Sequence, residues 1–370
     1  MTGPETTVAV LGGGQLGWML GLAGIPLGLE FRFLDPSPDA PARALGPLVV
    51  GALDDEPALR KVVKGARLAT FEWEGVPAGS ARLVAETVPV MPSPVALEVA
   101  QDRLAEKEMF LRLGIPTAGF AAVEGLDELW GAIADVGLPA VLKTRRGGYD
   151  GKLQAVLRTP DDVEEGWSGL PRVPLIVEER VEFEREVSVL AVRGADGVMR
   201  CWPVVANVHR DGILRLSRAP TPGLTHELQA LAEAIAARVL EALEYVGVLA
   251  IELFEVDGEL FANELAPRVH NSGHWTIEGA VTSQFENHLR AIVGWPLGST
   301  AARGVSAMVN CIGALPDAHD VLAVPGAHLH DYRKAPRRAR KLGHVTITAP
   351  DVDTLDERLA QLLPHIPSDG

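Results

Sequence analysis

The chain has 370 residues, of which 47% are hydrophobic, and its 49 acidic and 34 basic side chains give a formal net charge of −15. So acidic a chain argues against general nucleic-acid binding, which needs a basic face, and no stretch approaches the ~20 uninterrupted apolar residues of a membrane span. Two cysteines are too few for a disulfide framework, and no signal-peptide pattern opens the sequence, so we expect a cytoplasmic protein.

The first hundred residues alternate short apolar runs with helical patterns. This alternation, with Gly, Pro or Asp at the run boundaries, is typical of parallel strands joined by crossover helices. The runs expected to form strands are 7–12, 29–35, 47–51, 68–74 and 87–93.

Beyond residue 100 the pattern changes. Connections become rich in glycine, the apolar runs suggest antiparallel strands, and a small block of strands with a short helix closes the chain. The expected elements are helices over 102–113 and 227–244, and strands within 139–157, 175–183, 186–193, 199–205, 247–256, 259–266, 306–316 and 344–350.

The first strand leads into a glycine-rich turn. Gly12, Gly14 and Gly17 have the spacing G-x-G-x-x-G, and Asp35 ends the next apolar run, as in a dinucleotide-binding fingerprint. The same glycines serve any turn from a strand into a helix, and free amides at a helix start suit any phosphate or carboxylate. Nicotinamide binding and binding of another phosphate group therefore both stay open.

A second glycine loop, KTRRGGYDGKLQ, follows an apolar strand that ends at Lys143. Its glycines let the backbone fold over phosphates, and Arg145, Arg146 and Lys152 would offset their charge. A solvated basic hairpin is the alternative interpretation.

Two glutamates interrupt otherwise apolar strands. Glu252 lies in LAIELFEV and Glu264 in LFANEL, with a turn at Asp257 and Gly258 between them. A buried carboxylate is costly unless it is paired or bound to a metal. A three-residue turn would place the two glutamates opposite each other and a two-residue turn would shift them apart, so shared Mg²⁺ binding predicts an odd-numbered turn. Separate salt bridges are the alternative.

Polar residues are dense in NELAPRVHNSGHW, residues 263–275, directly after the second glutamate. The guanidinium fork of Arg268 could clamp a planar oxyanion. We expect His274 to make a structural hydrogen bond.

Six Lys and Arg residues gather between positions 333 and 341 of this acidic chain. We expect Lys334 and Arg340 to bind a substrate phosphate, and Arg337 and Arg338 to form a solvated face.

Taken together, these motifs make the chain resemble the ATP-grasp superfamily, and within it the N5-carboxyaminoimidazole ribonucleotide synthetases of purine biosynthesis. The resemblance covers essentially the whole chain, and GGGQLGWML, FEWEGVP, KTRRGGYDGKLQ, NELAPRVHNSGHW and RKLGH carry it. It implies an α/β and α+β fold in three parts. These are a Rossmann-like parallel-sheet domain over 1–102, an ATP-grasp domain over 103–300 with a mobile lobe at about 115–182, and a small C-terminal domain over 301–370.

The resemblance also implies an activity. ATP, bicarbonate and 5-aminoimidazole ribonucleotide would give the N5-carbamate, ADP and phosphate through carboxyphosphate. ATP and Mg²⁺ would be required, and the enzyme would be a cytoplasmic homodimer that binds small molecules rather than nucleic acid or a membrane.

Matching the family motifs residue by residue implies the following sites. ATP would be bound by Arg103, Lys143, Gly148, Tyr149, Asp150, Gly151, Lys152, Leu153, Gln154, Glu178, Glu179, Arg180, Val181, Glu186, His209, Asn263 and Glu264. The ribonucleotide and the activated bicarbonate would be bound by Gln15, Leu16, Tyr149, Asp150, Arg268, His270, Asn271, Ser272, Lys334 and Arg340. Arg268, His270, Asn271 and Asp150 would be catalytic, and Glu252 and Glu264 would hold Mg²⁺.

Two positions depart from the family pattern. Leu153 replaces the last glycine of the loop GYDGKGQ, which bears on the flexibility of the lid over the phosphates. Ala266 stands where many ATP-grasp enzymes have an asparagine metal ligand. Three rival interpretations are a sister ligase such as the formate-using glycinamide ribonucleotide transformylase, a non-catalytic relative, and a NAD-dependent dehydrogenase.

Overall fold

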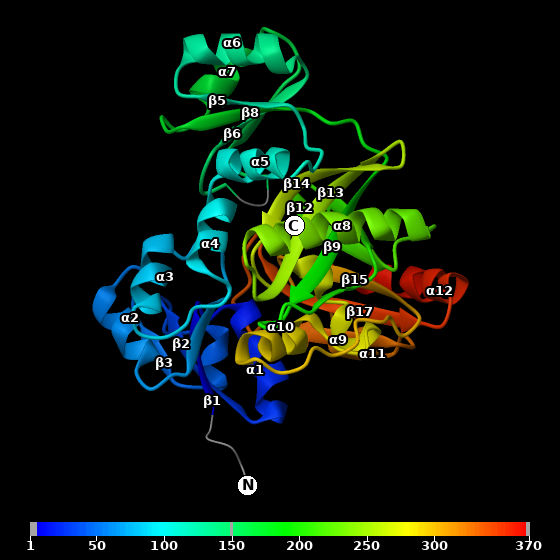
Figure 1. Cartoon of the computed structure of the whole chain (residues 1–370). Helices are drawn as coiled ribbons and strands as arrows, with labels where there is room; N and C mark the ends of the chain where they lie inside the picture. The colour runs from blue at the N-terminus through cyan, green and yellow to red at the C-terminus, as the bar shows by residue number, and fades with distance from the viewer. Residues whose placement is uncertain (1–5, 149–150, 368–370) are drawn as a thin grey trace.

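The computed structural model describes residues 6–148 and 151–367, which form three β-sheets flanked by helices (Figure 1). No helix within these residues is long and apolar enough to span a membrane.

The N-terminal sheet is parallel, with strand order β3-β2-β1-β4, as the alternating pattern predicts. The run 87–93 is an exception, because it contributes only an isolated bridge from Val90 to Ala69. Pro89 and Pro92 have no N–H to donate to a ladder, which explains why no strand forms there. The elements are β1 (Thr6–Leu11), α1 (Gln15–Gly24), β2 (Leu29–Asp35), β3 (Leu48–Val50), α2 (Glu56–Val63), β4 (Leu68–Phe71), α3 (Ala78–Ala85) and α4 (Pro94–Gln101).

A second, antiparallel sheet forms a lobe with its own hydrophobic core, seen at the top of Figure 1. The antiparallel order predicted for this block is confirmed. Its strand order is β5-β8-β6-β7, and helix α5 (Arg103–Arg112) leads into it. The lobe consists of β5 (Phe120–Val123), α6 (Leu126–Val136), β6 (Ala140–Thr144), β7 (Gln154–Leu157), α7 (Asp162–Ser168) and β8 (Leu175–Glu179).

The third sheet has nine strands in the order β14-β13-β9-β11-β12-β15-β17-β16, and β10 pairs with the C-terminal end of β9 on the same edge as β11. The strands of the C-terminal block extend this sheet, because β12 pairs with β15. Its elements are β9 (Arg185–Arg193), β10 (Met199–Cys201), β11 (Val205–Arg210), β12 (Ile213–Ala219), α8 (His226–Ala242), β13 (Gly247–Val256), β14 (Glu259–Ala266), α9 (Thr276–Gly279), α10 (Gln284–Val293), β15 (Val305–Ile312), α11 (Ala318–Leu322), β16 (Ala327–Asp331), β17 (Lys341–Ala349) and α12 (Val352–Leu362).

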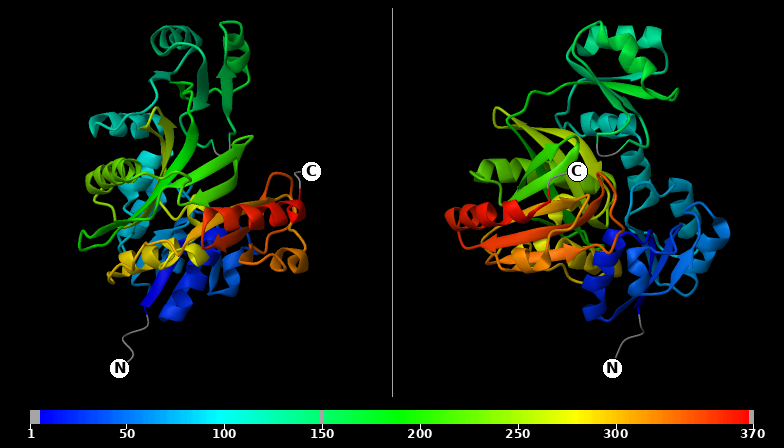
Figure 2. Two further views of the ribbon diagram at one scale, coloured as in Figure 1. Left: turned by 90° about the vertical axis from the view of Figure 1, so that its right-hand side faces the viewer. Right: turned by 180° about the vertical axis from the view of Figure 1, so that it is seen from behind.

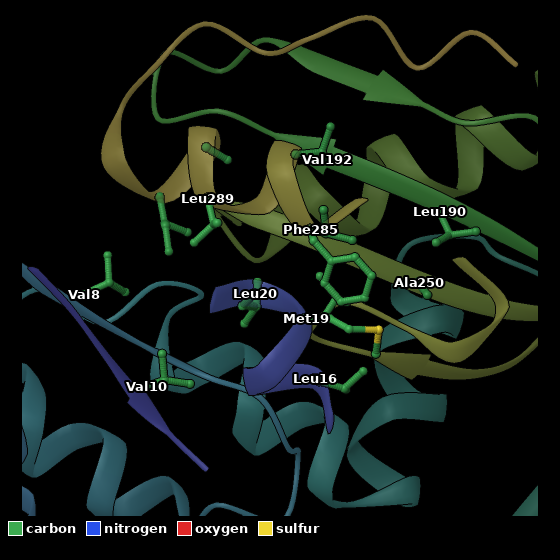
Figure 3. Packing of buried hydrophobic residues seen from close by; sticks show 14 of the residues in the cluster. Val8, Val10, Leu16, Met19, Leu20, Leu190, Val192, Ala250, Phe285 and Leu289 are labelled. Atoms are coloured by element: carbon green, nitrogen blue, oxygen red, sulfur yellow. The ribbon is translucent and has the colours of Figure 1, made fainter. Parts of the chain in front are cut away.

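One hydrophobic core joins the N-terminal domain to this sheet. Leu16 and Leu20 of α1 belong to the same buried cluster as Phe285 and Leu289 of α10 and Ala250 of β13 (Figure 3). Alternate residues of β13 face helix α8 in a separate cluster on the other side of the sheet. The views in Figure 2 show the N-terminal domain beside the large sheet, with the lobe standing away from both.

Candidate active site

A connected cavity of about 1330 Å³ lies between the N-terminal domain, the lobe and the large sheet. It brings together residues that are far apart in the sequence. The predicted site residues that line it are Gln15, Leu16, Arg103, Lys143, Gly148, Gly151, Lys152, Gln154, Glu186, His209, Glu252, Asn263, Glu264, Arg268, His270, Asn271, Lys334 and Arg340.

Several predicted residues lie elsewhere. Leu153, Glu178, Glu179, Arg180, Val181 and Ser272 are not among the residues that line the cavity. Tyr149 and Asp150 lie outside the described residues.

Three amides of the opening glycine turn, those of Gly13, Gly14 and Gly17, already donate to carboxylates. Gly13 N donates to Asp35 Oδ2 at 2.8 Å, and the amides of Gly14 and Gly17 donate to the two carboxylate oxygens of Glu72, each at 2.9 Å. A Cβ on Gly14 would lie 2.7 Å from Glu72 Oε1, so the glycine makes room for this carboxylate. A dinucleotide pyrophosphate would meet two carboxylates here, which removes the basis of the dehydrogenase interpretation.

The two ends of the chain meet at this turn. Lys334, in the cationic loop between β16 and β17, donates from Nζ to Gln15 Oε1. The guanidinium of Arg333 lies 4.8 Å from the centroid of the Trp18 ring. Burial lowers the pKa of Lys334 to about 8, and Arg340 acts in the same direction, while Glu72 opposes the shift. Burial disfavours the charged form of Lys334, so a bound anion would stabilise this charge.

Arg337 and Arg338 are exposed, as expected for a solvated face, although Arg337 also lies at the edge of the cavity.

Glu252 and Glu264 are directly opposite each other, but the predicted turn is wrong. The turn has two residues, Asp257 and Gly258, and the register shifts by one position so that Glu252 pairs with Glu264. The shift is a β-bulge at Asn263, and a bulge of this kind sets two residues against one on the partner strand. Asn263 and Glu264 can therefore both line the cavity although they are consecutive.

The charges around this pair favour a divalent cation. Burial, followed by the charge of Glu264, raises the pKa of Glu252 to about 7. Two facing carboxylates at one cavity wall are the donor set that Mg²⁺ takes from proteins, with phosphate and water oxygens completing its shell. The residues present thus fit the metal that the family implies, even though Ala266 offers no ligand.

Sequence reasoning missed a third carboxylate beside the pair. Glu106 on α5 lines the cavity and is 2% exposed, and its Oε1 accepts from the backbone N of Leu265 at 2.6 Å. Burial, followed by the charge of Glu264, raises the pKa of Glu106 to about 8. Its spacing of three and four positions from the buried Met109 and Phe110 could have placed it on the inner face of the helix.

His209 and Glu186, on the neighbouring strands β11 and β9, form an ion pair at the cavity wall. Burial would lower the pKa of His209, but the hydrogen bond and the charges of Glu186 and Glu252 outweigh it, so the pKa is raised.

The basic glycine loop is held by two residues that precede it in the sequence, Asp102 and Arg103. Arg145 and Arg146 bind the carboxylate of Asp102 at 2.7 and 3.2 Å, so this carboxylate already offsets much of the charge that we assigned to the phosphates. Arg103 reaches the loop directly, donating to Gly148 O at 2.9 Å.

Leu153 adopts the backbone conformation that explains the usual glycine. Its φ is +57°, in the left-handed region that costs a non-glycine residue about 1–2 kcal/mol. Its side chain is 42% exposed and its carbonyl accepts from Thr144 N. The loop therefore keeps the turn at this position despite the substitution.

A buried carboxylate lies between two lysines under the loop. Glu178 Oε2 is 3.1 Å from Lys143 Nζ and 3.4 Å from Lys107 Nζ. Burial would raise the pKa of Glu178, but the charges of the two lysines outweigh it and the pKa is lowered. Lys107 also donates to Thr117 Oγ1 at 3.0 Å, where the chain enters the lobe.

The loop after β14, which we call the substrate loop (residues 267–275), is held by buried partners. Arg268 forms an ion pair from Nε with Glu74 of the N-terminal domain and donates to Val269 O at 3.0 Å. Gln284 accepts from His270 N at 2.9 Å and donates to His270 O at 2.7 Å. Gln284 also contacts His274 Nδ1 at 3.2 Å, so His274 has the structural hydrogen bond that we expected.

His270 is a neutral imidazole in this loop. Burial, followed by the charge of Arg268, lowers its pKa well below the usual value. Its Nδ1 accepts from Ser272 N at 3.3 Å and lies 2.8 Å from Ser272 Oγ, which assigns the proton to Nε2. Nε2 lies 3.4 Å from Glu252 Oε1, so the substrate loop and the glutamate pair are neighbours. Ser272 is fully buried and contacts His270 instead of lining the cavity.

Comparison with known proteins gives a consistent result along the whole chain. Family models match for a ribonucleotide synthetase preATP-grasp domain at residues 5–101, an ATP-grasp domain at 108–285 and a phosphoribosylaminoimidazole carboxylase C-terminal domain at 306–358. The N5-carboxyaminoimidazole ribonucleotide synthase of Pseudomonas aeruginosa is 54% identical over 96% of this chain and 98% of that protein.

Solved structures agree with this result. The N5-carboxyaminoimidazole ribonucleotide synthetase of Thermus thermophilus is 55% identical, with a TM-score of 0.95 over 98% of this chain and 99% of the other. The Aspergillus clavatus synthase, solved with ADP and 5-aminoimidazole ribonucleotide, is 32% identical, with a TM-score of 0.92 over 98% of both chains.

Proposed function

Because this chain belongs to the N5-carboxyaminoimidazole ribonucleotide synthase family of ATP-grasp ligases, we propose that its cavity carries out the carboxylation of 5-aminoimidazole ribonucleotide with ATP and bicarbonate. The products are N5-carboxyaminoimidazole ribonucleotide, ADP and phosphate. The observation that carries this proposal is the single cavity in which facing carboxylates lie next to a loop with Arg268 and to the cations around Lys334.

At the ATP end, we assign charge neutralisation to this chain's cations and amides. Lys143, Arg103 and the glycine loop would hold the phosphates, with Glu186 and His209 on the facing strands. Bound Mg²⁺, held by Glu252 and Glu264, would supply further positive charge to the transferring phosphoryl group.

At the other end, Lys334 and Arg340 would bind the phosphate of the ribonucleotide, and Gln15 and Leu16 would contact the same nucleotide. Lys334 already contacts Gln15, so a phosphate seated there would bridge the two ends of the chain. This placement puts the aminoimidazole ring toward the substrate loop.

The chemistry needs positioning rather than a nucleophilic side chain. A bicarbonate oxygen attacks the γ-phosphorus, which forms carboxyphosphate and releases ADP. The amine of the ribonucleotide then attacks the carbon, either of carboxyphosphate itself or of the carbon dioxide left when phosphate departs, and in both cases phosphate takes up the amine proton. Arg268 would hold the carboxylate, and the Nε2–H of neutral His270 would donate to one of its oxygens.

Carboxyphosphate hydrolyses readily, so the site must exclude water during the reaction. We propose that the lobe over about 115–182 closes on ATP for this purpose. The strand-rich lobe is joined to the rest by the region of Lys107 and Thr117, where such a movement would begin.

The test is a mixture of the protein with ATP, Mg²⁺, bicarbonate and aminoimidazole ribonucleotide, followed by ADP release. We expect ADP release to depend on all four components, and a rate that ignores the ribonucleotide would contradict the proposal. Supplying formate and glycinamide ribonucleotide instead distinguishes the sister transformylase. Chelation of Mg²⁺ by EDTA should stop turnover.

Replacement of Arg268 tests its assignment. We expect Arg268→Ala to lower kcat by about 100-fold or more while the KM for ATP stays within about twofold. The reverse pattern, a raised KM for ATP with an unchanged kcat, would show that Arg268 belongs to the ATP site.

We also propose a homodimer, which the family resemblance supports, and a cytoplasmic location, which the low cysteine content supports. Light scattering of the purified protein tests the dimer, and cell fractionation tests the location.

A further inference from the structure

We propose that Asn310 is a positioning residue for the carboxylation step, which it serves by setting the orientation of the Asn271 side chain. The inference rests on the proposed function. Asn310 lies on β15, is 3% exposed and is not among the residues that line the cavity, whereas Asn271 lies in the substrate loop and does line it.

The two asparagines form a reciprocal amide pair. Asn271 Nδ2 donates to Asn310 Oδ1 at 3.1 Å, and Asn310 Nδ2 donates to Asn271 Oδ1 at 2.7 Å. Asn310 Nδ2 uses its second N–H on the carbonyl oxygen of Leu214, at 2.9 Å. Both N–H bonds of Asn310 are therefore used within the protein.

The carbonyl of Leu214 decides which way both amides face. A carbonyl oxygen can only accept, so it fixes the nitrogen of Asn310 on the side of β12. The oxygen of Asn310 must then accept from the nitrogen of Asn271, and the reverse orientation of Asn271 would set oxygen against oxygen and nitrogen against nitrogen. One N–H and one lone pair of Asn271 remain directed away from this pair.

The position of Asn310 in the sequence supports a dedicated role. It is a single amide between Val309 and Cys311, in a strand that is buried from Ser306 onward. Burying an amide without partners costs about 1–3 kcal/mol, so an apolar residue would suit the core equally well if packing alone mattered. The hydrogen bonds instead connect the C-terminal part of the sheet to the substrate loop.

Loss of the Asn310–Asn271 pair would affect the reaction of the ribonucleotide. Asn271 lies between His270 and the buried Ser272, at the wall where the ribonucleotide and the activated bicarbonate are proposed to react. A rotated or mobile Asn271 would slow capture of carboxyphosphate by the amine. It would leave the ATP end unchanged, because the side-chain hydrogen bonds of Asn310 go to Asn271 and to Leu214 O.

Two variants test the proposal. Asn310→Asp keeps the size but loses both N–H donors, and Asn310→Leu removes every hydrogen bond. We expect each to lower kcat/KM for aminoimidazole ribonucleotide by on the order of 10- to 100-fold, with the KM for ATP within about twofold of wild type. The ratio of phosphate released to carboxylated product should rise above one, because uncaptured carboxyphosphate hydrolyses.

A double-mutant cycle identifies the route of the effect. If Asn310 acts only through Asn271, adding Asn310→Leu to Asn271→Ala leaves kcat/KM for the ribonucleotide as in Asn271→Ala alone. Ser306→Ala is the matched control, because Ser306 is buried on the same strand and its Oγ has no hydrogen-bond partner among the residues that the structure describes. This control should keep the wild-type product ratio.

The inference would be overturned if kcat/KM for the ribonucleotide in Asn310→Asp stayed within twofold of wild type. It would also be overturned if the losses of kcat/KM in the two single variants multiplied in the double variant. A rise in the KM for ATP as large as the loss of kcat/KM for the ribonucleotide would overturn it as well. If Asn310→Leu does not fold, Asn310→Asp decides alone. A wild-type protein without ribonucleotide-dependent turnover would instead contradict the proposed function.

Discussion

At the scale of single residues, Lys334 links burial to the pH range of substrate binding. Burial lowers its pKa to about 8, so the side chain is charged below that pH and neutral above it. If Lys334 binds the phosphate of the ribonucleotide, the KM for this substrate should rise between about pH 8 and pH 9, by up to about tenfold per unit. Initial rates at saturating ATP and bicarbonate measure this.

Arginine at the same position provides the control, because a guanidinium stays protonated throughout this range. We expect Lys334→Arg to have a KM for the ribonucleotide that no longer changes between pH 8 and pH 9. The same rise in both proteins would assign the titration to another group.

The chemical type of the site residues could be predicted from sequence, whereas their partners could not. Glu252 and Glu264 stand out because charged residues are unusual in an apolar strand. Lys334 stands out because it belongs to a cluster of basic residues in an acidic chain. The contact between Gln15 and Lys334 spans 319 positions, and no local pattern indicates it. For the same reason Asp102 could not be recognised as the partner of Arg145.

At the scale of elements, strand pairing was predicted better than strand register. The alternation of apolar residues indicated β13 and β14 and their hairpin, but the bulge at Asn263 changed how the glutamates meet. A bulge adds one residue without a signal in the apolar pattern, since the residues on either side still alternate. Glu252 and Glu264 therefore lie opposite each other, as shared Mg²⁺ binding requires, although the predicted turn length is wrong.

Because the bulge rather than the turn aligns the glutamates, a change in the turn at Gly258 should affect stability but not the glutamate pair. Asp257 and Gly258 have φ of +51° and +80°, which glycine adopts at no cost and other residues adopt at about 1–2 kcal/mol. Gly258→Ala should lower the free energy of unfolding in urea by about 1 kcal/mol. The Mg²⁺ concentration for half-maximal activity should stay the same, because the bulge aligns the glutamates.

Asp257→Asn is the matched control for the turn, since asparagine tolerates the left-handed region. It should change neither stability nor Mg²⁺ dependence. A shift in Mg²⁺ dependence in Gly258→Ala would mean that the turn itself sets the spacing of the pair.

At the scale of the whole molecule, the parts of the chain are held together by contacts between segments that are far apart in the sequence. β12 pairs with β15 across the expected domain boundary, and α1 shares a core with α10 and β13. Such pairings depend on which surfaces meet in space, so they could not be predicted from local patterns. The cavity depends on them, because its walls come from both ends of the chain.

His288 makes one of these ties sensitive to acid. It is 1% exposed on α10, where Nδ1 accepts from Val248 N at 3.1 Å and Nε2 lies 3.1 Å from Thr70 Oγ1 of the N-terminal sheet. Burial lowers its pKa to about 4 from the ordinary value of 6.5. Between these values the unfolded chain binds a proton that the folded protein does not, so stability falls as pH drops through this window.

His288→Asn keeps a side-chain oxygen for Val248 N but removes the titration, and it isolates this one proton. At pH 7 we expect the variant to unfold at lower urea than wild type. As the pH falls toward 4, the difference in unfolding free energy should shrink by about 1.4 kcal/mol per unit. The reason is that only wild type has a histidine here that is protonated when unfolded and neutral when folded. His319→Asn, whose parent side chain is 92% exposed, should follow wild type. A constant difference between His288→Asn and wild type from pH 7 to pH 5 would show that His288 does not link acid to the joint between the N-terminal sheet and β13.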